Sequence, residues 1–181
     1  MKRKIYNKEL KETIYFRKTS ADTGGEYTEL EISLEPKGGN PLHFHKSYTE
    51  LFTAVKGRLG MELLGGKIII LRPGESYLVK KGEIHRFFNP DNESVTFTNR
   101  VEPGSAGLEN TLRILCGLAG DGLYSKGNIP RNPLHLAVCA EMSDMRLTGW
   151  KGIVTTPFIR VLSFIAVKTS VKQALVEKYC I

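Results

Sequence analysis

Three of the four histidines in this 181-residue chain, together with one glutamate, are spaced so that they could hold a metal ion. His43 and His45 are two residues apart, and side chains two apart on a strand point to the same face. Glu50 follows after four more residues, which we expect to bend, because strand alternation would otherwise send Glu50 to the opposite face from His45. A histidine pair alone is also common as a surface pair or as a hydrogen-bonded structural pair.

Two groups of residues resemble the two sequence motifs of the cupin superfamily, and together they cover about residues 38–90. The first motif is matched in every spacing by His43-x-His45, Glu50 after four further residues and Gly57 after six more. The second motif is matched by Gly74, Lys80-x-Gly82 after five residues, His85 after two and Asn89 after three. Two motifs in the right order, 16 residues apart, are far more specific than either motif alone.

Two positions depart from the family pattern. Lys80 stands where the second motif commonly has proline, and Lys37 stands where the first motif usually opens with a glycine. Gly38 and Gly39 follow Lys37 at once. Neither position coordinates metal, so the departures concern the turns and leave the set of ligands complete.

The resemblance implies a jelly-roll β-barrel with an internal metal site, whose ligands would be His43, His45, Glu50 and His85. Three neutral imidazoles and one carboxylate suit one divalent transition metal, such as Mn, Fe, Ni, Co, Cu or Zn, and suit Mg or Ca poorly. An octahedral ion would keep two positions for water, dioxygen or a small carboxylate or enolate. The remaining positive charge favours an anionic ligand. A barrel that kept the motifs without any activity is the alternative.

Strand alternation extends the predicted site to two aromatic residues. Phe52 should face inward with Glu50, and Phe87 with His85, so both are expected to line a partly apolar pocket beside the ion. Filling of the barrel core is an equally good interpretation of both. The catalytic residues stay unknown, because Glu62 and Glu83, the acidic residues nearby in the sequence, are expected on the surface.

Short strands must position these side chains. Over residues 27–103, alternating or β-branched runs are separated by glycine, proline and asparagine, which is typical of an all-β unit. Residues 30–34 alternate apolar and polar side chains and predict a strand with one buried face. The pair Gly65-Gly66 predicts a hairpin turn. Further strands are predicted near 59–63, 68–71, 77–79, 84–88 and 95–101.

After Gly104 the hydrophobic period becomes that of helices. An apolar stripe with intervals of four, three and four is formed by Leu108, Leu112, Leu115 and Ala119. Asn132-Pro133 and Thr156-Pro157 each offer a cap residue followed by proline at the first helical position. Helices are expected near residues 106–119, 133–142 and 157–179.

The chain is therefore predicted to be mainly β, with a cupin jelly-roll β-barrel over residues 1–104 and a C-terminal α-helical extension over residues 105–181. The length suits one domain with an appendage. The apolar stripe of the last helix, formed by Phe158, Val161, Leu162 and Ile165, should pack on the barrel or on a second subunit. We expect a homodimer.

Composition narrows the range of partners. The net charge of +7 is spread along the chain, and no segment is typical of a nucleic-acid-binding arm. We expect no spanning helix, because no apolar run reaches about 20 residues, and we favour protein packing over interfacial membrane binding. The first dozen residues lack the apolar stretch of a secretory signal, so a cytoplasmic location is expected. Cys116, Cys139 and Cys180 are expected to be buried or idle thiols, and His135 a packing or surface residue.

These observations indicate a metal-binding cupin that presents one divalent transition metal to a small organic ligand, anionic or enolic in character. A metal-dependent dioxygenase or another oxidoreductase is the favoured activity. The alternative is a non-catalytic small-molecule binding or sensing cupin, because the fold alone does not decide the function.

Overall fold

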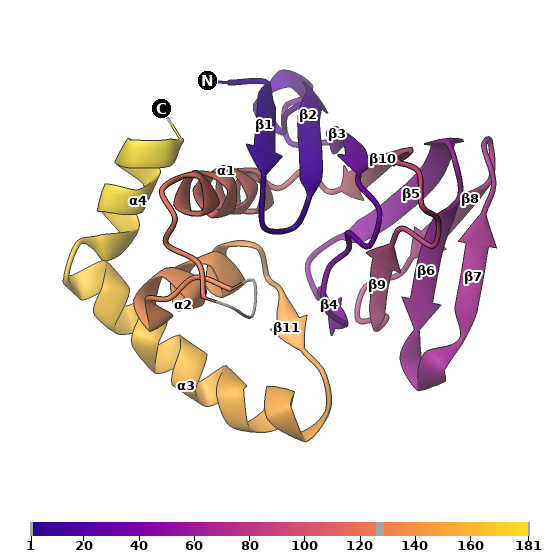
Figure 1. Cartoon of the computed structure of the whole chain (residues 1–181). Coiled ribbons are helices and arrows are strands. Elements are labelled where there is room, and N and C mark those ends of the chain that lie inside the picture. Colours follow the sequence, from indigo (N-terminus) through magenta and orange to yellow (C-terminus); the bar gives the residue numbers. More distant parts are fainter. Residues whose placement is uncertain (1, 126–128, 181) are drawn as a thin grey trace.

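The computed structural model describes residues 2–125 and 129–180, in which two antiparallel sheets are followed by a group of helices (Figure 1). The strands are β1 (Lys4–Asn7), β2 (Glu12–Lys18), β3 (Thr28–Leu34), β4 (His43–Phe44), β5 (Thr49–Lys56), β6 (Leu59–Leu63), β7 (Ile68–Leu71), β8 (Ser76–Val79), β9 (His85–Phe88), β10 (Val95–Glu102) and β11 (Arg146–Leu147). The α-helices are α1 (Ala106–Gly120), α2 (Pro133–Met142), α3 (Gly149–Lys168) and α4 (Val171–Tyr179), and short 3₁₀ turns lie at Ala21–Thr23 and Leu64–Gly66.

The two sheets face each other across one core. The first has the strand order β1-β2-β3-β10-β5-β8, and the second has the order β11-β4-β9-β6-β7. Buried side chains of both sheets form a single apolar cluster that includes Phe16, Phe52, Phe87 and Phe97. This arrangement is the double-stranded β-helix of the cupin fold, as the sequence predicts, with helices at the C-terminal end.

The alternation of residues 30–34 does produce the predicted strand. In β3 every second side chain, from Thr28 to Leu34, is buried, and those between are partly exposed. The predicted turn also forms, because Gly65 and Gly66 have φ angles of 82° and 79°, which glycine adopts without a steric penalty. Local pattern is therefore sufficient to fix these elements.

An N-terminal hairpin adds two strands that we did not predict. Strand β2 pairs with β3, and β1 pairs with β2, at the edge of the first sheet. Ile14 and Phe16 of β2 are fully buried and belong to the core between the sheets. Their alternation with Thr13 and Tyr15 is the sequence signal that was available for this strand.

Two of the predicted helices form within a residue of their expected bounds, and the third differs. The last predicted helix, 157–179, is two helices: α3 begins earlier, at Gly149, and ends at Lys168, and α4 follows after Ser170, whose φ is 60°. Pro157 therefore lies inside a helix rather than at its start. A proline removes one backbone hydrogen bond, to the carbonyl four residues earlier, and a helix can continue past it at that cost.

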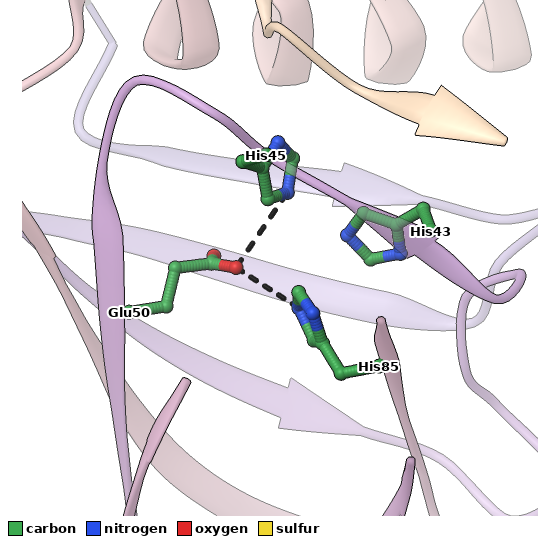
Figure 2. Close-up of side chains that lie close together, drawn as sticks. All are labelled: His43, His45, Glu50 and His85. Atoms are coloured by element: carbon green, nitrogen blue, oxygen red, sulfur yellow. Dashed lines mark ion pairs between the residues drawn. The ribbon is translucent and has the colours of Figure 1, made fainter. Parts of the chain in front are cut away.

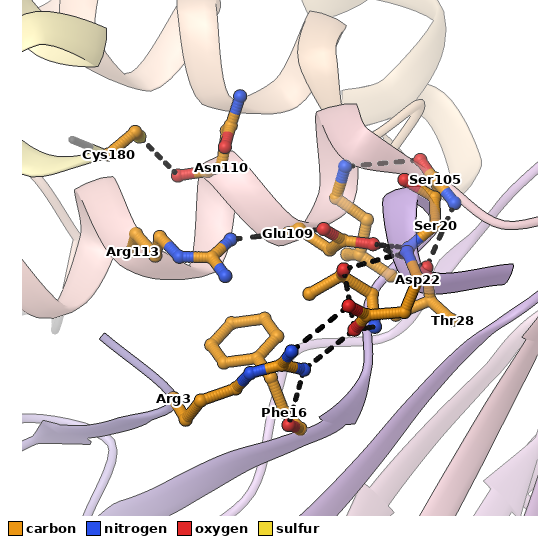
Figure 3. Close-up of polar contacts among 12 residues, drawn as sticks. Arg3, Phe16, Ser20, Asp22, Thr28, Ser105, Glu109, Asn110, Arg113 and Cys180 are labelled. Carbon is orange, nitrogen blue, oxygen red and sulfur yellow. Dashed lines mark hydrogen bonds and ion pairs between the residues drawn. The ribbon is translucent and has the colours of Figure 1, made fainter. Parts of the chain in front are cut away.

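Helix α1 is anchored to the first sheet through the buried carboxylate of Glu109 (Figure 3). Its Oε1 accepts hydrogen bonds from the Ser20 N–H and from Thr28 Oγ1, each at 2.6 Å. One turn later the guanidinium of Arg113 lies over the Phe16 ring, 3.9 Å from its centroid. These contacts fix α1 against β2 and β3, and α1 in turn packs against α2 and α4.

The helices bury a second apolar cluster of their own, which includes two of the three cysteines. Cys116, Cys139 and Cys180 are all buried free thiols, as expected. His135 on α2 is half-buried.

Three of the four side chains in the apolar stripe of α3 are exposed, and the fourth, Leu162, is half-buried. Phe158 and Val161 expose 61% and 57% of their surface, and Ile165 exposes 39%. Packing of this stripe on the barrel or on a second subunit stays a prediction. None of the helices in the described part of the chain has both the length and the apolar character that crossing a bilayer requires.

Candidate metal centre

The four predicted ligands come together between the two sheets (Figure 2). His43 lies in β4 and His85 directly opposite it in β9, both in the second sheet. His45 follows the end of β4. The chain then bends through residues 46–48 and enters β5, a strand of the first sheet, which carries Glu50. The bend that strand parity required is therefore present, and it lets one carboxylate from the first sheet face imidazoles from the second.

The ligand atoms of this group are close and buried. One such atom from each residue lies within 4.8 Å of all the others. Glu50 Oε2 is 3.0 Å from His85 Nε2 and 3.5 Å from His45 Nε2. No member of the group exposes more than 5% of its surface. The dimensions match those of a site where several atoms share one central ion.

Hydrogen bonds from the Nδ1 atoms fix the tautomer of each imidazole. His43 Nδ1 lies 2.8 Å from the carbonyl oxygen of Pro41, and His85 Nδ1 lies 3.0 Å from that of Glu83. A carbonyl oxygen can only accept a hydrogen bond, so each Nδ1 must carry the proton. The Nε2 lone pairs are left free to bind an ion, which is the arrangement commonly found for metal-bound histidine.

The tautomer of His45 is fixed in the same way, by one hydroxyl and by two carbonyl oxygens from far along the chain. Its Nδ1 lies 2.8 Å from the Tyr48 hydroxyl, and 3.2 and 3.3 Å from the carbonyl oxygens of Ser143 and Asp144. The Tyr48 hydroxyl donates its own hydrogen to the Ser143 carbonyl at 2.7 Å. The Tyr48 oxygen must then accept from His45 Nδ1, and Nε2 of His45 is again unprotonated.

Two atoms at the centre of the group are buried and have no hydrogen-bond partner in the part of the chain that the structure describes. They are Glu50 Oε2 and His85 Nε2, which are close in distance but not aligned for a hydrogen bond. Leaving a buried polar atom unsatisfied costs about 1–3 kcal/mol. A cation between the two atoms would satisfy both, so the residues present fit a metal ion.

The pKa values of the group follow from burial and from its mixed charges. Burial lowers the pKa of His43 to about 3, with a further contribution from the other two histidines. Burial also lowers the pKa of His45. Burial would raise the pKa of Glu50, but the contact with His85 and the charges of the histidines outweigh it and lower this pKa to about 2. Burial likewise opposes the charge on His85, but the contact with Glu50 prevails and raises its pKa.

Phe52 and Phe87 both lie in the apolar core, as the second interpretation of these residues proposed. Phe52 is also a neighbour of the ligands, because its ring centroid is 6.0 Å from that of His85. The two phenylalanine rings are 5.9 Å apart. Whether they also line a ligand pocket stays a prediction.

Glu62 and Glu83 are not among the group, and neither is fully exposed. Glu62 is half-buried and bonded to Arg86 at 2.6 Å. Glu83 is half-buried too and accepts from the Tyr77 hydroxyl at 2.6 Å. We expected surface positions for both; their cross-strand and turn partners cover them in part.

Sequence reasoning missed the residues that support the ligands. Asn99 Nδ2 donates to Glu50 Oε1 at 2.8 Å, from the neighbouring strand β10. Its sequence signal was an asparagine at an inward position, in line with the buried Val95, Phe97 and Val101. Tyr48, Ser143 and Asp144 gave no comparable signal, because their role depends on tertiary contacts.

Comparisons with known proteins agree with this architecture. Residues 30–99 match the family described as cupin domain. The chain is 34% identical over 88 residues to germin-like protein 3-8 of Oryza sativa subsp. japonica, covering 45% of this chain and 39% of that protein. It is 44% identical over 50 residues to oxidoreductase OpS7 of Beauveria bassiana, covering 27% and 16%. The chain thus spans at most 39% of the length of these two relatives.

The chain is also similar over about half of its length to solved structures of other proteins. The polyketide cyclase RemF from Streptomyces resistomycificus is 22% identical with a TM-score of 0.47, covering 51% of this chain and 65% of that chain. A predicted oxalate decarboxylase from Thermotoga maritima is 17% identical with a TM-score of 0.48, covering 51% and 80%.

The family match spans β3 to β10, and it contains all four residues of the group that could hold a metal ion. Both cupin motifs lie on the strands and turns that bring this group together. Residues 30–99, which carry both motifs and all four candidate ligands, are therefore a cupin domain.

Proposed function

We propose that this protein binds one divalent transition metal through His43, His45, Glu50 and His85 and presents it to a small organic ligand. One observation carries the proposal: the four ligand atoms are buried within 4.8 Å of one another, and two of them have no hydrogen-bond partner among the described residues. Neutral nitrogen ligands with one carboxylate suit Mn, Fe, Co, Ni, Cu or Zn better than Mg or Ca. The positive charge that remains after pairing with one carboxylate favours an anionic ligand.

The protein's own residues prepare the site for such an ion. Carbonyl acceptors on the Nδ1 side hold the imidazoles with Nε2 free, and Asn99 holds one oxygen of Glu50, so that the other points at the centre. The low pKa values of His43 and Glu50 keep the first neutral and the second ionised at neutral pH. When bound, the ion would supply Lewis acidity and, for a redox metal, electron transfer.

Oxidoreductase chemistry, dioxygenase-like in kind, is the activity we favour. Tyr48, Asn99 and Phe52 are described side chains that contact the ligands, and none of these three offers a free general base. Burial raises the pKa of Tyr48, and its hydroxyl hydrogen is already donated to Ser143. A reaction that depends on the ion itself suits this environment better than one that needs a second proton acceptor. The short match to a protein named as an oxidoreductase supports the same class.

A non-catalytic binding or sensing cupin is the second candidate. The same observation favours it, because a site without a free acid or base among these three side chains can bind a ligand without transforming it. Oxygen uptake by the Fe²⁺-loaded protein, in the presence of small carboxylates and enols, would indicate the oxidoreductase. Binding of the same compounds in calorimetry, without oxygen uptake or product, would indicate the binding module.

Metal content tests the proposal directly. Protein purified without chelator and without a metal-affinity step should carry about one transition-metal ion per chain. The double variant His43→Ala/His85→Ala should lose it, whereas His135→Ala, which removes a half-buried histidine outside the site, should keep it. Elemental analysis of the three proteins gives the answer. Near-full occupancy in the double variant would show that the assigned residues do not hold the ion.

A further inference from the structure

The helical extension reaches the candidate metal centre through β11 and the two residues just before Met145. Strand β11 pairs with β4, so that Leu147 lies opposite His43 and Arg146 opposite Phe44. The residues just before β11, Ser143 and Asp144, thereby come to lie beside the segment that carries His43 and His45. Figure 1 shows β11 leaving the helices to join the sheet next to β4.

The carboxylate of Asp144 holds the bend between His45 and Glu50. Its Oδ2 accepts hydrogen bonds from the Lys46 N–H at 2.7 Å, the Ser47 N–H at 2.8 Å and the Ser47 hydroxyl at 2.9 Å. Its Oδ1 pairs with Arg146 at 3.0 Å. The backbone of Asp144 has a φ of 50°, a left-handed conformation in which aspartate and asparagine are several-fold enriched.

The backbone of the same two residues faces the imidazole of His45. The Ser143 and Asp144 carbonyl oxygens lie 3.2 and 3.3 Å from His45 Nδ1, and Tyr48 bridges His45 to Ser143. Ser143 is the C-terminal cap of α2, only 2% exposed, and its N–H and hydroxyl both donate to the Cys139 carbonyl. The end of a helix carries partial negative charge on its carbonyl groups, which favours a donor such as Nδ1–H.

His45 differs in this respect from the other two imidazoles. His43 and His85 bond to carbonyls two residues away in their own segments, Pro41 and Glu83. His45 bonds to carbonyls 98 and 99 residues away. Local chain geometry alone therefore orients two of the imidazoles, whereas the third is oriented by Tyr48, three residues away, together with the helical extension.

We propose that Asp144 is a positioning residue of the metal centre, which fixes the bend at Lys46 and Ser47 and presents the Ser143 and Asp144 carbonyls to His45. The inference rests on the proposed function, because it concerns the ligand geometry of the same ion. It adds that metal affinity depends on the docking of the helical extension. By thermodynamic reciprocity, a bound ion must also stabilise that docking.

Binding of Co²⁺ to the full chain tests the proposal, with the visible absorption spectrum of the bound ion as a second measurement. Asp144→Gly removes the carboxylate, while glycine accepts the left-handed backbone. We expect it to bind Co²⁺ about 10–100-fold more weakly, with an altered spectrum, as is typical when an outer-shell partner of a ligand is lost. Asp144→Asn restores an acceptor oxygen and should recover part of the affinity.

Asp22→Gly is the matched control. In the unmodified chain, Asp22 Oδ2 also accepts hydrogen bonds from a backbone N–H and a hydroxyl, both of Thr19, and the Asp22 carboxylate also pairs with an arginine, Arg3. The Asp22→Gly variant should keep the Co²⁺ affinity and spectrum of the unmodified chain, even if its thermal stability is lower.

Each result has one meaning. Wild-type affinity and spectrum in both Asp144 variants would overturn the positioning role while leaving the metal site intact. An equal loss in Asp22→Gly would reduce the effect to general stability and overturn it as well. If Asp144→Gly does not fold, Asp144→Asn decides by its spectrum. A wild-type chain that binds no Co²⁺ would overturn the proposed function and this inference together.

Discussion

At the scale of single residues, His85 and Glu50 have pKa values that move in opposite directions for the same reason. The two side chains are buried side by side, and each stabilises the charged form of the other. This contact raises the pKa of His85 and lowers that of Glu50. The raised pKa of His85 favours a proton on this imidazole when no ion is bound. An incoming cation must therefore displace that proton.

Metal affinity should consequently rise with pH across the neutral range. The pKa of His85 lies above its ordinary value of about 6.5, so below the raised pKa each pH unit should change the affinity by up to about tenfold. Above the raised pKa the affinity should level off, and towards about pH 5 the ion should be released. Co²⁺ titrations at a series of pH values provide the measurement.

In the metal-free protein, the contribution of His85 to folding stability should fall as the pH rises, whereas the metal affinity rises. A raised histidine pKa contributes stability that is fully present below the unfolded pKa and is lost as the pH rises through the folded pKa. The free energies of unfolding of the metal-free and the metal-bound protein should therefore diverge as the pH rises, because only the metal-bound protein gains stability at high pH. Affinity that does not change between about pH 5 and about pH 8 would contradict histidine ligation.

The candidate ligands could be found from the sequence because their spacing is a local property. His43-x-His45, Glu50 and His85 lie at fixed intervals within short segments, and strand parity then fixes the faces. The sequence indicated a role for Asn99 only weakly, through a polar residue at an inward position of a strand. The positions of Ser143 and Asp144 could not be inferred, because nothing near them in the chain shows that they will meet His45.

At the scale of elements, the same distinction explains which strands were predicted. Strand β3 and the Gly65-Gly66 turn follow from alternation and from glycine's freedom at positive φ. Strand β11 has two residues and exists only because β4 offers a free edge. The start of α3 was wrongly placed at Pro157, since proline is a better indicator of a helix start than of its interior.

The turn before β4 shows why the family usually has glycine where this chain has Lys37. Lys37 is exposed and has a φ of 65°, a left-handed conformation that costs an L-residue about 1–2 kcal/mol. Glycine removes this strain but adds freedom to the unfolded chain, at a cost of about 0.4–1 kcal/mol. Lys37→Gly should therefore raise the free energy of unfolding by up to about 1.6 kcal/mol, measured in urea.

Lys81→Gly is the control for this change. Lys81 is also an exposed lysine in a turn, but its φ is not positive. Glycine there should lower the free energy of unfolding by about 0.4–1 kcal/mol, because only the cost in the unfolded chain applies. Equal effects at the two positions would show that the left-handed conformation of Lys37 stores no strain.

At the scale of the whole molecule, the sheets and the helices have separate apolar cores, and α1 connects them. The Glu109 carboxylate is a polar link between α1 and the first sheet, with two short hydrogen bonds from the sheet side. Glu109→Ala leaves the Ser20 N–H and the Thr28 hydroxyl without this acceptor. We expect a loss of about 2–4 kcal/mol in the free energy of unfolding, since bonds to a charged, buried group are worth more than neutral ones.

Glu141→Ala, on the exposed face of α2, should change the free energy of unfolding by no more than about 0.5 kcal/mol. Urea unfolding of the two variants under the same conditions gives the comparison. Equal losses in the free energy of unfolding for Glu109→Ala and Glu141→Ala would mean that the Glu109 carboxylate does not help to join the helices to the sheets.

The bonds between His45 and residues 143 and 144 also matter for the order in which the protein is made. All four candidate ligands lie within the first 85 residues, and they leave the ribosome well before the helical extension does. A growing chain thus contains every ligand before it contains the carbonyls that orient one of them. The geometry of the centre is complete only once residues 143 and 144 have been synthesised and have docked beside His45, so the tight binding that we propose would report that docking.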